Sequence, residues 1–129
     1  MLAVDTNVVV RFLMDDHPGQ ASQARKLLAE NEVFVSTTVI LETAWVLRSA
    51  YGLSNERCAE ALAGLAGLAG VLLEDAAAVA KALGWMQQGL DFADGLHLAT
   101  AEGCEAFVTF DRDFARVAKR LGDIPIRAP

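Results

Sequence analysis

Short apolar runs alternate with amphipathic stretches along the whole chain. The runs at residues 2–4, 33–35, 71–73 and 106–109 have the length of buried strands, and 124–126 has that of a final edge strand. Between them, apolar residues recur at three- and four-residue spacing, which predicts seven helices. In chain order these are 7–14, one from Pro18, one ending near Ala50, one from about Ser54, 76–88, about 94–103 and one from Asp111. This alternation predicts an α/β protein, a three-layer α/β/α arrangement with a central parallel sheet of four or five short strands.

Three glycines interrupt the fourth predicted helix, in the run Ala-Gly-Leu, Ala-Gly-Leu, Ala-Gly-Val at 63–71. Each glycine costs a helix about 1 kcal/mol relative to alanine. The helix therefore either ends here or presents Gly64, Gly67 and Gly70 as a small-residue stripe. Such a stripe serves a close contact within the chain or a contact between subunits.

Length and composition predict a single globular domain over residues 1–129, with a core that needs no disulfide. Hydrophobic residues make up 53% of the chain, yet no apolar run approaches the ~20 residues of a membrane-spanning helix. The start has no basic segment followed by a long apolar one, so no signal peptide is expected. We therefore expect a cytoplasmic protein without membrane contact, in which Cys58 and Cys104 are buried free thiols.

Four carboxylates stand out by their positions. Asp5 ends the first predicted strand, Asp111 follows the strand at 106–109, and Asp94 lies at the start of a helix. Because the carboxyl ends of parallel strands and the following helical turns meet at one edge of a sheet, these residues can converge. The alternative for each of them is a helix cap, which accepts backbone N–H groups.

Glu42 is the fourth carboxylate and does not fit the cap alternative. It lies inside a helix that is apolar almost all round, with Val39, Trp45 and Val46 as neighbours. A buried, unpaired carboxylate costs several kcal/mol, so Glu42 requires a cation or a hydrogen-bonding cleft. A metal site is the simplest answer, and Arg11 is the other candidate partner.

The chemistry of these four residues favours a hard divalent cation. Carboxylate oxygens suit Mg²⁺ or Mn²⁺, and the chain has no His and Cys cluster for zinc. Several carboxylates within a few ångströms cannot all ionise without one or two such ions. A metal of this kind activates water and clamps phosphate oxygens, so the expected reaction is hydrolysis of a phosphodiester.

Four segments in this order resemble the PIN domain, specifically the VapC-type toxin ribonucleases of bacterial and archaeal toxin–antitoxin pairs. They are VDTN at 4–7, LET at 41–43, DFADGLHLA at 91–99 and TFDRDF at 109–114. Each is a weak pattern alone, but the similarity covers essentially the whole chain.

The resemblance implies that Asp5, Glu42, Asp94 and Asp111 form the catalytic acidic quartet. Asp5, Asp94 and Asp111 would hold Mg²⁺ or Mn²⁺, with Glu42 acting through water. It further implies endonucleolytic cleavage of RNA, a homodimer and silencing by a cognate antitoxin. Every acidic position of the family pattern is filled, which argues against an inactivated copy.

Several nearby residues have two interpretations. Thr6 and Asn7 either support the Asp5 carboxylate or cap the first helix. Thr109 is a similar candidate for support of the site. Asp113 is either a solvated helix residue or an assistant to Asp111. Asp91 lies one turn from Asp94 and is the alternative to it. His97 is either a structural histidine or a general base.

The net charge of −6 alone argues against a nucleic-acid partner, but the cations are unevenly placed. Five of the 11 lysines and arginines fall within the last 18 residues, and the final predicted helix carries four of them on one face: Arg112, Arg116, Lys119 and Arg120. This face is either solvated, or meets RNA phosphates or an acidic antitoxin tail. With few aromatic residues in the chain, we do not expect an aromatic platform for bases.

Other classes fit less well. A receiver-type signalling domain requires an acidic pair after the first strand and a lysine ending a late strand, and Asp5 stands alone. A haloacid-dehalogenase-like phosphatase requires a second aspartate where Asn7 stands. A PIN-fold RNA-processing nuclease without an antitoxin remains the main alternative.

Overall fold

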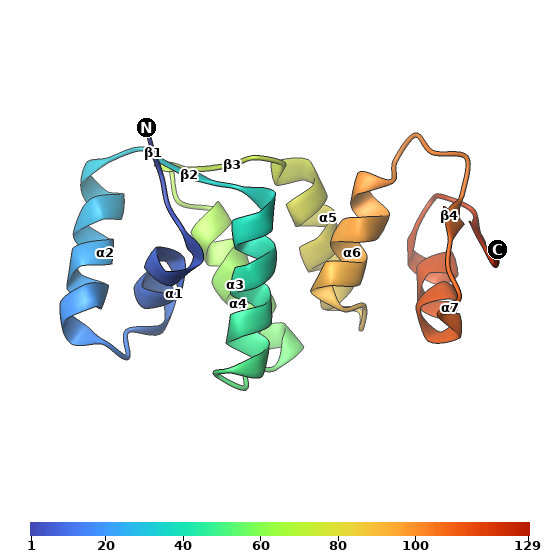
Figure 1. Cartoon of the computed structure of the whole chain (residues 1–129), viewed down its shortest axis with the longest axis horizontal. Helices are drawn as coiled ribbons and strands as arrows, with labels where there is room; N and C mark the ends of the chain where they lie inside the picture. The colour runs from blue at the N-terminus through green and yellow to red at the C-terminus, as the bar shows by residue number, and fades with distance from the viewer. The chain divides into compact units, whose positions relative to one another are not determined.

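The computed structural model describes residues 1–129, and the chain divides into two compact units, Met1–Ala76 and Ala77–Pro129 (Figure 1). Each unit has a parallel sheet of its own. None of the helices combines the length and the apolar character that crossing a membrane requires.

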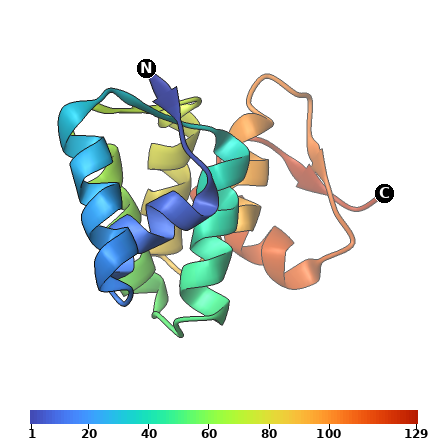
Figure 2. The ribbon, with the colours of Figure 1, turned by 60° about the vertical axis from the view of Figure 1, so that its left-hand side comes forward.

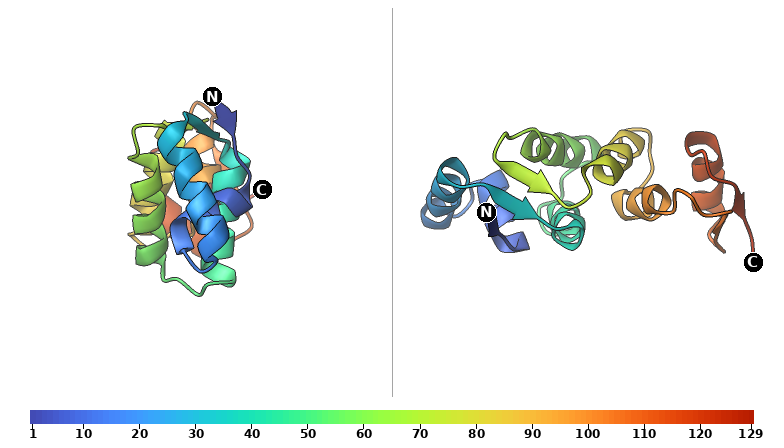
Figure 3. Two further views of the ribbon diagram at one scale, coloured as in Figure 1. Left: turned by 90° about the vertical axis from the view of Figure 1, so that its left-hand side faces the viewer. Right: turned by 90° about the horizontal axis from the view of Figure 1, so that it is seen from above.

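The first unit holds a three-stranded parallel sheet in the order β1-β2-β3. Its elements, in chain order, are β1 (Leu2–Ala3), α1 (Thr6–Met14), α2 (Pro18–Glu30), β2 (Val33–Val35), α3 (Thr37–Ser49), α4 (Asn55–Ala66) and β3 (Val71–Leu73). The central strand β2 aligns Val33 with both Leu2 and Val71. Figure 2 shows β1 running into α1, and the right-hand view of Figure 3 shows α3 and α4 on opposite sides of the strands.

Local sequence signals set the helix boundaries in this unit. The side chains of Ser36 and Ser54 accept hydrogen bonds from the backbone N–H groups of Val39 and Arg57, and so cap α3 and α4. Pro18 occupies the first position of α2, where its missing N–H costs nothing. Helix α4 ends at Ala66 with Gly67 as its C-cap, so the glycine run terminates the helix instead of forming a stripe along it.

The second unit begins one residue into α5 (Ala76–Met86) and also contains α6 (Phe92–Thr100), β4 (Phe107–Val108), α7 (Arg112–Leu121) and β5 (Ile126–Arg127). Strands β4 and β5 form a separate parallel pair. A buried cluster joins α6, α7 and β5 through Leu90, Leu98, Phe114, Ala118 and Ile126. The Phe107 ring packs on this cluster, with its centroid 5.0 Å from that of Phe114.

Two expectations need correction. A central sheet of four or five strands is not observed, because three strands form one sheet and β4 and β5 pair only with each other. The apolar runs located the strands, but runs of two or three residues carry no information about which strands pair. Both cysteines are free thiols as expected, but only Cys58 is buried; Cys104 is exposed in the turn after α6.

Candidate active site

Asp5 lies just beyond the carboxyl end of β1 and caps α1. Its backbone is extended (φ −93°, ψ 176°), and its Oδ1 accepts a hydrogen bond from the Val8 N–H at 3.1 Å. The cap interpretation is therefore correct for this residue. The cap uses one carboxylate oxygen and fixes the side-chain direction, so the other oxygen of this exposed side chain stays free to bind a ligand.

Glu42 is tied to the residue next to Asp5. The hydroxyl of Thr6, a side chain with only 7% exposure, donates a hydrogen bond to Glu42 Oε1. This contact joins the first turn of α1 to the middle of α3. Thr6 therefore positions Glu42, while Asp5 itself provides the helix cap. Neither role that the sequence analysis offered for Thr6, support of the Asp5 carboxylate or capping of the first helix, is the one observed.

The expectation that Glu42 is buried was wrong. The side chain is exposed, and α3 buries only the face that carries Ile40, Thr43, Ala44 and Leu47. Trp45, taken from the sequence as an apolar neighbour, is 68% exposed. A helix that is apolar all round does not reveal which face the fold covers, so the argument from burial does not hold.

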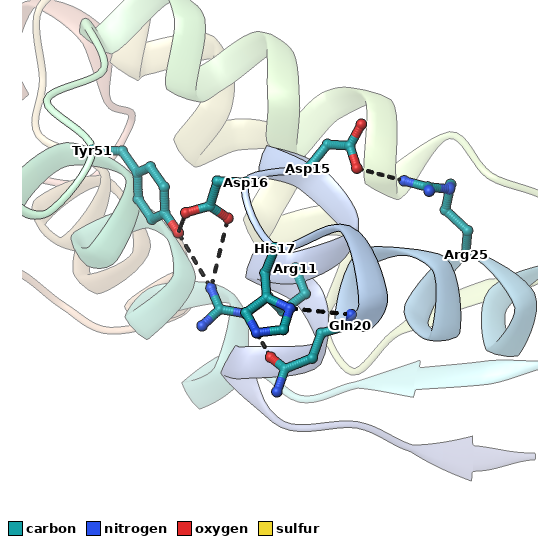
Figure 4. A network of polar contacts seen from close by, with 7 residues as sticks. All are labelled: Arg11, Asp15, Asp16, His17, Gln20, Arg25 and Tyr51. Carbon is teal, nitrogen blue, oxygen red and sulfur yellow. Dashed lines mark hydrogen bonds and ion pairs between the residues drawn. The ribbon is translucent and has the colours of Figure 1, made fainter.

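Arg11 is not the partner of Glu42, because a separate polar network holds it (Figure 4). Its Nε donates to Gln20 Oε1 at 2.7 Å, and its Nη1 lies 3.7 Å from Asp16 Oδ1 and 3.4 Å from the Tyr51 hydroxyl. The Tyr51 hydroxyl in turn donates to Asp16 Oδ2 at 2.8 Å. This hydrogen bond raises the pKa of Tyr51, with smaller contributions from burial and from the negative charge of Asp16.

A cleft of about 360 Å³ opens beside Asp5 between α1 and α2. Its polar lining includes Asn7, Gln20 and Gln23, and Leu27 lies at its apolar end. Asn7 therefore faces the same cleft as Asp5, and it is Asp5 that caps α1.

Asp94 lies in the first turn of α6 but does not cap it. The cap is Asp91, whose Oδ2 accepts from the N–H groups of Ala93 and Asp94 at 3.1 and 3.4 Å. Asp91 thus satisfies the helix end, and the Asp94 carboxylate accepts neither of these hydrogen bonds.

The pKa of Asp94 is raised above its ordinary value. Partial burial is the main cause, and the negative charges of Asp91 and Asp111 add to it, while the nearby His97 acts in the opposite direction. Asp94 and Asp111 are therefore close enough within the second unit to repel one another. A carboxylate in this position gains from a nearby cation.

Asp111 caps α7. Its Oδ1 accepts from the Phe114 N–H at 2.9 Å, and its own N–H donates to Thr109 Oγ1 at 3.0 Å. Thr109 thus supports the backbone of Asp111 and not its carboxylate. Asp113 lies 3.5 Å from Arg116, with both side chains largely exposed, as expected for a solvated helix residue.

The four predicted acids divide between the units, two in each: Asp5 and Glu42 lie in the first unit, and Asp94 and Asp111 lie in the second. Neither unit by itself gathers three His, Cys, Asp or Glu side chains into a metal-binding group. The donors in both units are carboxylate oxygens with at least one oxygen free of the caps, which is the chemistry that Mg²⁺ and Mn²⁺ prefer.

One residue that the sequence analysis overlooked is Phe110, whose side chain is 87% exposed directly before Asp111. It borders a second cleft, of about 630 Å³, along α7 and β5. The overlooked signal was its position: three phenylalanines surround Asp111 at 107, 110 and 114, and only two are needed to fill the core beneath α7.

Comparison with known proteins gives one family assignment. No curated protein matches the chain. A family model described as PIN domain matches residues 2–120, which covers both units and all four acids. PIN domains are generally nucleases, and they typically use divalent metals such as Mg²⁺. A match over this share of the sequence shows that the chain belongs to the PIN domain family.

Proposed function

We propose that this protein is an endoribonuclease dependent on Mg²⁺ or Mn²⁺, and that it is the toxin of a type II toxin–antitoxin pair. The observation that carries the proposal is the PIN domain match over residues 2–120, with an acidic side chain at each of Asp5, Glu42, Asp94 and Asp111. The four segments that resemble VapC-type toxins support the narrower assignment.

Asp5, Asp94 and Asp111 would hold the metal directly, and Glu42 would act through a bound water. When bound, the ion supplies an activated water and neutralises charge on the phosphate. The caps at Asp5 and Asp111 orient these side chains before any ligand arrives. Thr6 does the same for Glu42, since its hydroxyl fixes one of the two carboxylate oxygens.

Water, not a side chain, is the proposed nucleophile. No serine or cysteine lies beside a base within the four motif segments, so no covalent intermediate with the protein is expected. Attack on phosphorus forms one P–O bond while the bond to the leaving sugar oxygen breaks. The negative charges of Asp91 and Asp111, which add to the effect of burial in raising the pKa of Asp94, support the proposal, because a bound cation would offset their repulsion.

The remaining expectations belong to this proposal. We propose a cytoplasmic homodimer that a cognate antitoxin protein silences. A PIN-fold RNA-processing nuclease without an antitoxin shares the chemistry, and a gene for a small antitoxin directly upstream distinguishes the two.

The test is cleavage of total RNA, with mapped ends, in Mg²⁺ and in EDTA. We expect metal-dependent internal cuts by the natural protein, and loss of at least about 100-fold in activity for Asp5→Asn and Asp94→Asn. Asp113→Asn removes an equally charged but solvated side chain and serves as the matched control. Full activity in both site variants, with circular dichroism unchanged, would reject the assignment.

A further inference from the structure

The cleft beside Asp111 has an unusual lining for a protein of net charge −6. Four cationic side chains and one aromatic ring border it: Arg112, Arg116, Lys119, Arg127 and Phe110. Asp111 is the only carboxylate among the lining residues. We refer to this feature, about 630 Å³ in volume, as the C-terminal cleft.

The Phe110 ring has no role in the packing of its own unit. Its neighbours Phe107 and Phe114 pack against each other in a tilted arrangement, with ring centroids 5.0 Å apart, whereas Phe110 is 87% exposed, more than any other large hydrophobic side chain. A single exposed apolar residue is ordinary on a protein surface. That general observation does not explain an exposed ring that borders a cationic cleft next to a candidate metal ligand.

The cations of the cleft are largely uncompensated. Arg112, Lys119 and Arg127 form no ion pair. The contact of Arg116 with Asp113 is long, at 3.5 Å, and both side chains are more than three-quarters exposed. Arg120, which the sequence grouped with this face, is absent from the cleft and donates instead to the Gln88 carbonyl at 3.4 Å.

We propose that the C-terminal cleft is a binding subsite for single-stranded RNA, in which one base stacks on Phe110 and the flanking phosphates lie along the four cations. This proposal rests on the proposed function, since Asp111 at the cleft edge would bring the bound strand to the metal. A single ring is not the aromatic platform that the sequence analysis considered, but it provides a stacking surface for one base.

The combination of ring and charge favours RNA over an acidic protein tail. Carboxylates of an acidic tail would pair with the cations but would leave the ring without a partner. A single strand offers a phosphate and a π-face in every nucleotide, so it uses both features together. Stacking accepts any base, so the subsite would hold the strand without selecting its sequence.

The experiment measures binding without cleavage. The probe is a fluorescein-labelled, 2′-O-methylated single-stranded oligonucleotide, which resists cleavage through the 2′-oxygen, in EDTA with the full chain. We expect Phe110→Ala to weaken binding, read by fluorescence anisotropy, by about 5- to 100-fold, the usual effect of removing one stacked base. Phe110→Tyr retains the ring and should bind within about twofold of the natural protein.

Two controls separate stacking from charge. Leu72→Ala removes an exposed apolar side chain from β3 and should leave binding unchanged. Arg127→Ala should reduce the slope of log affinity against log salt by about 0.7, the value for one lost phosphate contact on a single strand, whereas Arg57→Ala on α4 should not. A probe with abasic positions should remove the difference between Phe110→Ala and the natural protein.

Three binding results overturn the proposal. No measurable binding by the natural protein does so, as does binding by Phe110→Ala that equals it, or a loss that persists with the abasic probe. Polyglutamate that binds through Arg127 while Phe110→Ala leaves oligonucleotide binding intact would indicate an acidic protein partner. The binding assay contains no free metal, so its result is independent of the cleavage assay. Oligonucleotide binding without any RNA cleavage would reject the nuclease proposal and retain the subsite. RNA cleavage without oligonucleotide binding would retain the nuclease proposal and reject the subsite.

Discussion

Thr6 donates its hydroxyl hydrogen to Glu42 across 36 positions of sequence, and this contact is the direct link between the first turn of α1 and the candidate catalytic face of α3. The donor is nearly buried and the acceptor is exposed. A buried donor restricts the acceptor to one direction, while the second oxygen of Glu42 remains accessible to a water.

Thr6→Val removes this donor and keeps the shape of the side chain. We expect RNA cleavage to fall by about 10- to 100-fold, the usual cost of losing a group that orients a metal-site carboxylate. Stability should fall by only about 1 kcal/mol in urea unfolding, because exposed Glu42 regains water as a partner. Thr6→Ser restores the hydroxyl and should recover most of the activity; a valine variant as active as the natural protein would remove Glu42 orientation from the mechanism.

The helix cap formed by Asp111 and its proposed role as a metal ligand are separable by two substitutions. Asparagine caps a helix as well as aspartate does, so Asp111→Asn should unfold at nearly the natural urea concentration. Asp111→Ala should cost about 1 kcal/mol, because the Phe114 N–H loses its acceptor. Both variants should lose metal-dependent cleavage, measured with the same RNA substrate. Cleavage that falls only in the alanine variant would show that Asp111 serves the fold alone.

Asp94 should destabilise the metal-free protein when it is ionised. Its pKa is raised in the folded state, mainly by burial and then by Asp91, so its favourable contribution exists at low pH and is lost as pH rises above the ordinary aspartate range. Asp94→Asn should therefore raise the melting temperature in EDTA at pH 7, while the gain shrinks toward pH 3.

Magnesium provides the second half of the Asp94 test. Added Mg²⁺ should raise the melting temperature of the natural protein, because it binds only the folded state, and should raise that of Asp94→Asn less. Asp113→Asn, at a solvated position on α7, should follow the natural protein in both measurements. An Asp94→Asn protein that melts lower than the natural one in EDTA would show that its carboxylate is paired rather than strained.

Replacement by alanine should change the free energy of unfolding differently at two glycines of the second unit. Gly84 lies within α5 with no atom near the position of an added Cβ, so Gly84→Ala should stabilise the protein by about 0.5 to 1 kcal/mol. Gly95 in α6 faces Ala82, and a Cβ would lie 3.2 Å from its Cα and Cβ. Gly95→Ala should therefore show none of that gain in urea unfolding, and equal stabilisation of the two variants would mean that α5 and α6 pack less closely.

Local signals made much of this structure predictable from the sequence. The serine caps, Pro18 at the start of α2 and the glycine that ends α4 all act within one turn, so the sequence specifies them directly. The same is true of Asp5 and Asp111, whose cap and site roles the sequence could name but not separate.

The parts that could not be predicted depend on distant residues. Glu42 was expected to be buried because its helix is apolar on every side, and only the fold decides that Ile40 and Leu47 face inward while Trp45 faces out. Its true partner, Thr6, lies on another helix. Phe110 was also missed because its exposure depends on distant residues. Nothing in the local sequence distinguishes it from Phe107 and Phe114, and only the folded core beneath α7 shows that those two rings fill it.

Tyr51 offers a test of the polar network around Arg11, because it is the only tyrosine in the chain and its ionisation can be followed by ultraviolet absorbance. Its hydroxyl donates to Asp16, which raises the pKa of Tyr51 above the ordinary value of 10.0. Asp16→Asn should lower the titration midpoint, because the negative acceptor disappears while Arg11 remains beside the hydroxyl. Asp15→Asn removes the neighbouring carboxylate, which pairs with Arg25 and not with Tyr51, and should leave the midpoint unchanged. Equal midpoints in the natural protein and Asp16→Asn would mean that Tyr51 and Asp16 are apart in solution, and that Arg11 is free to serve another carboxylate.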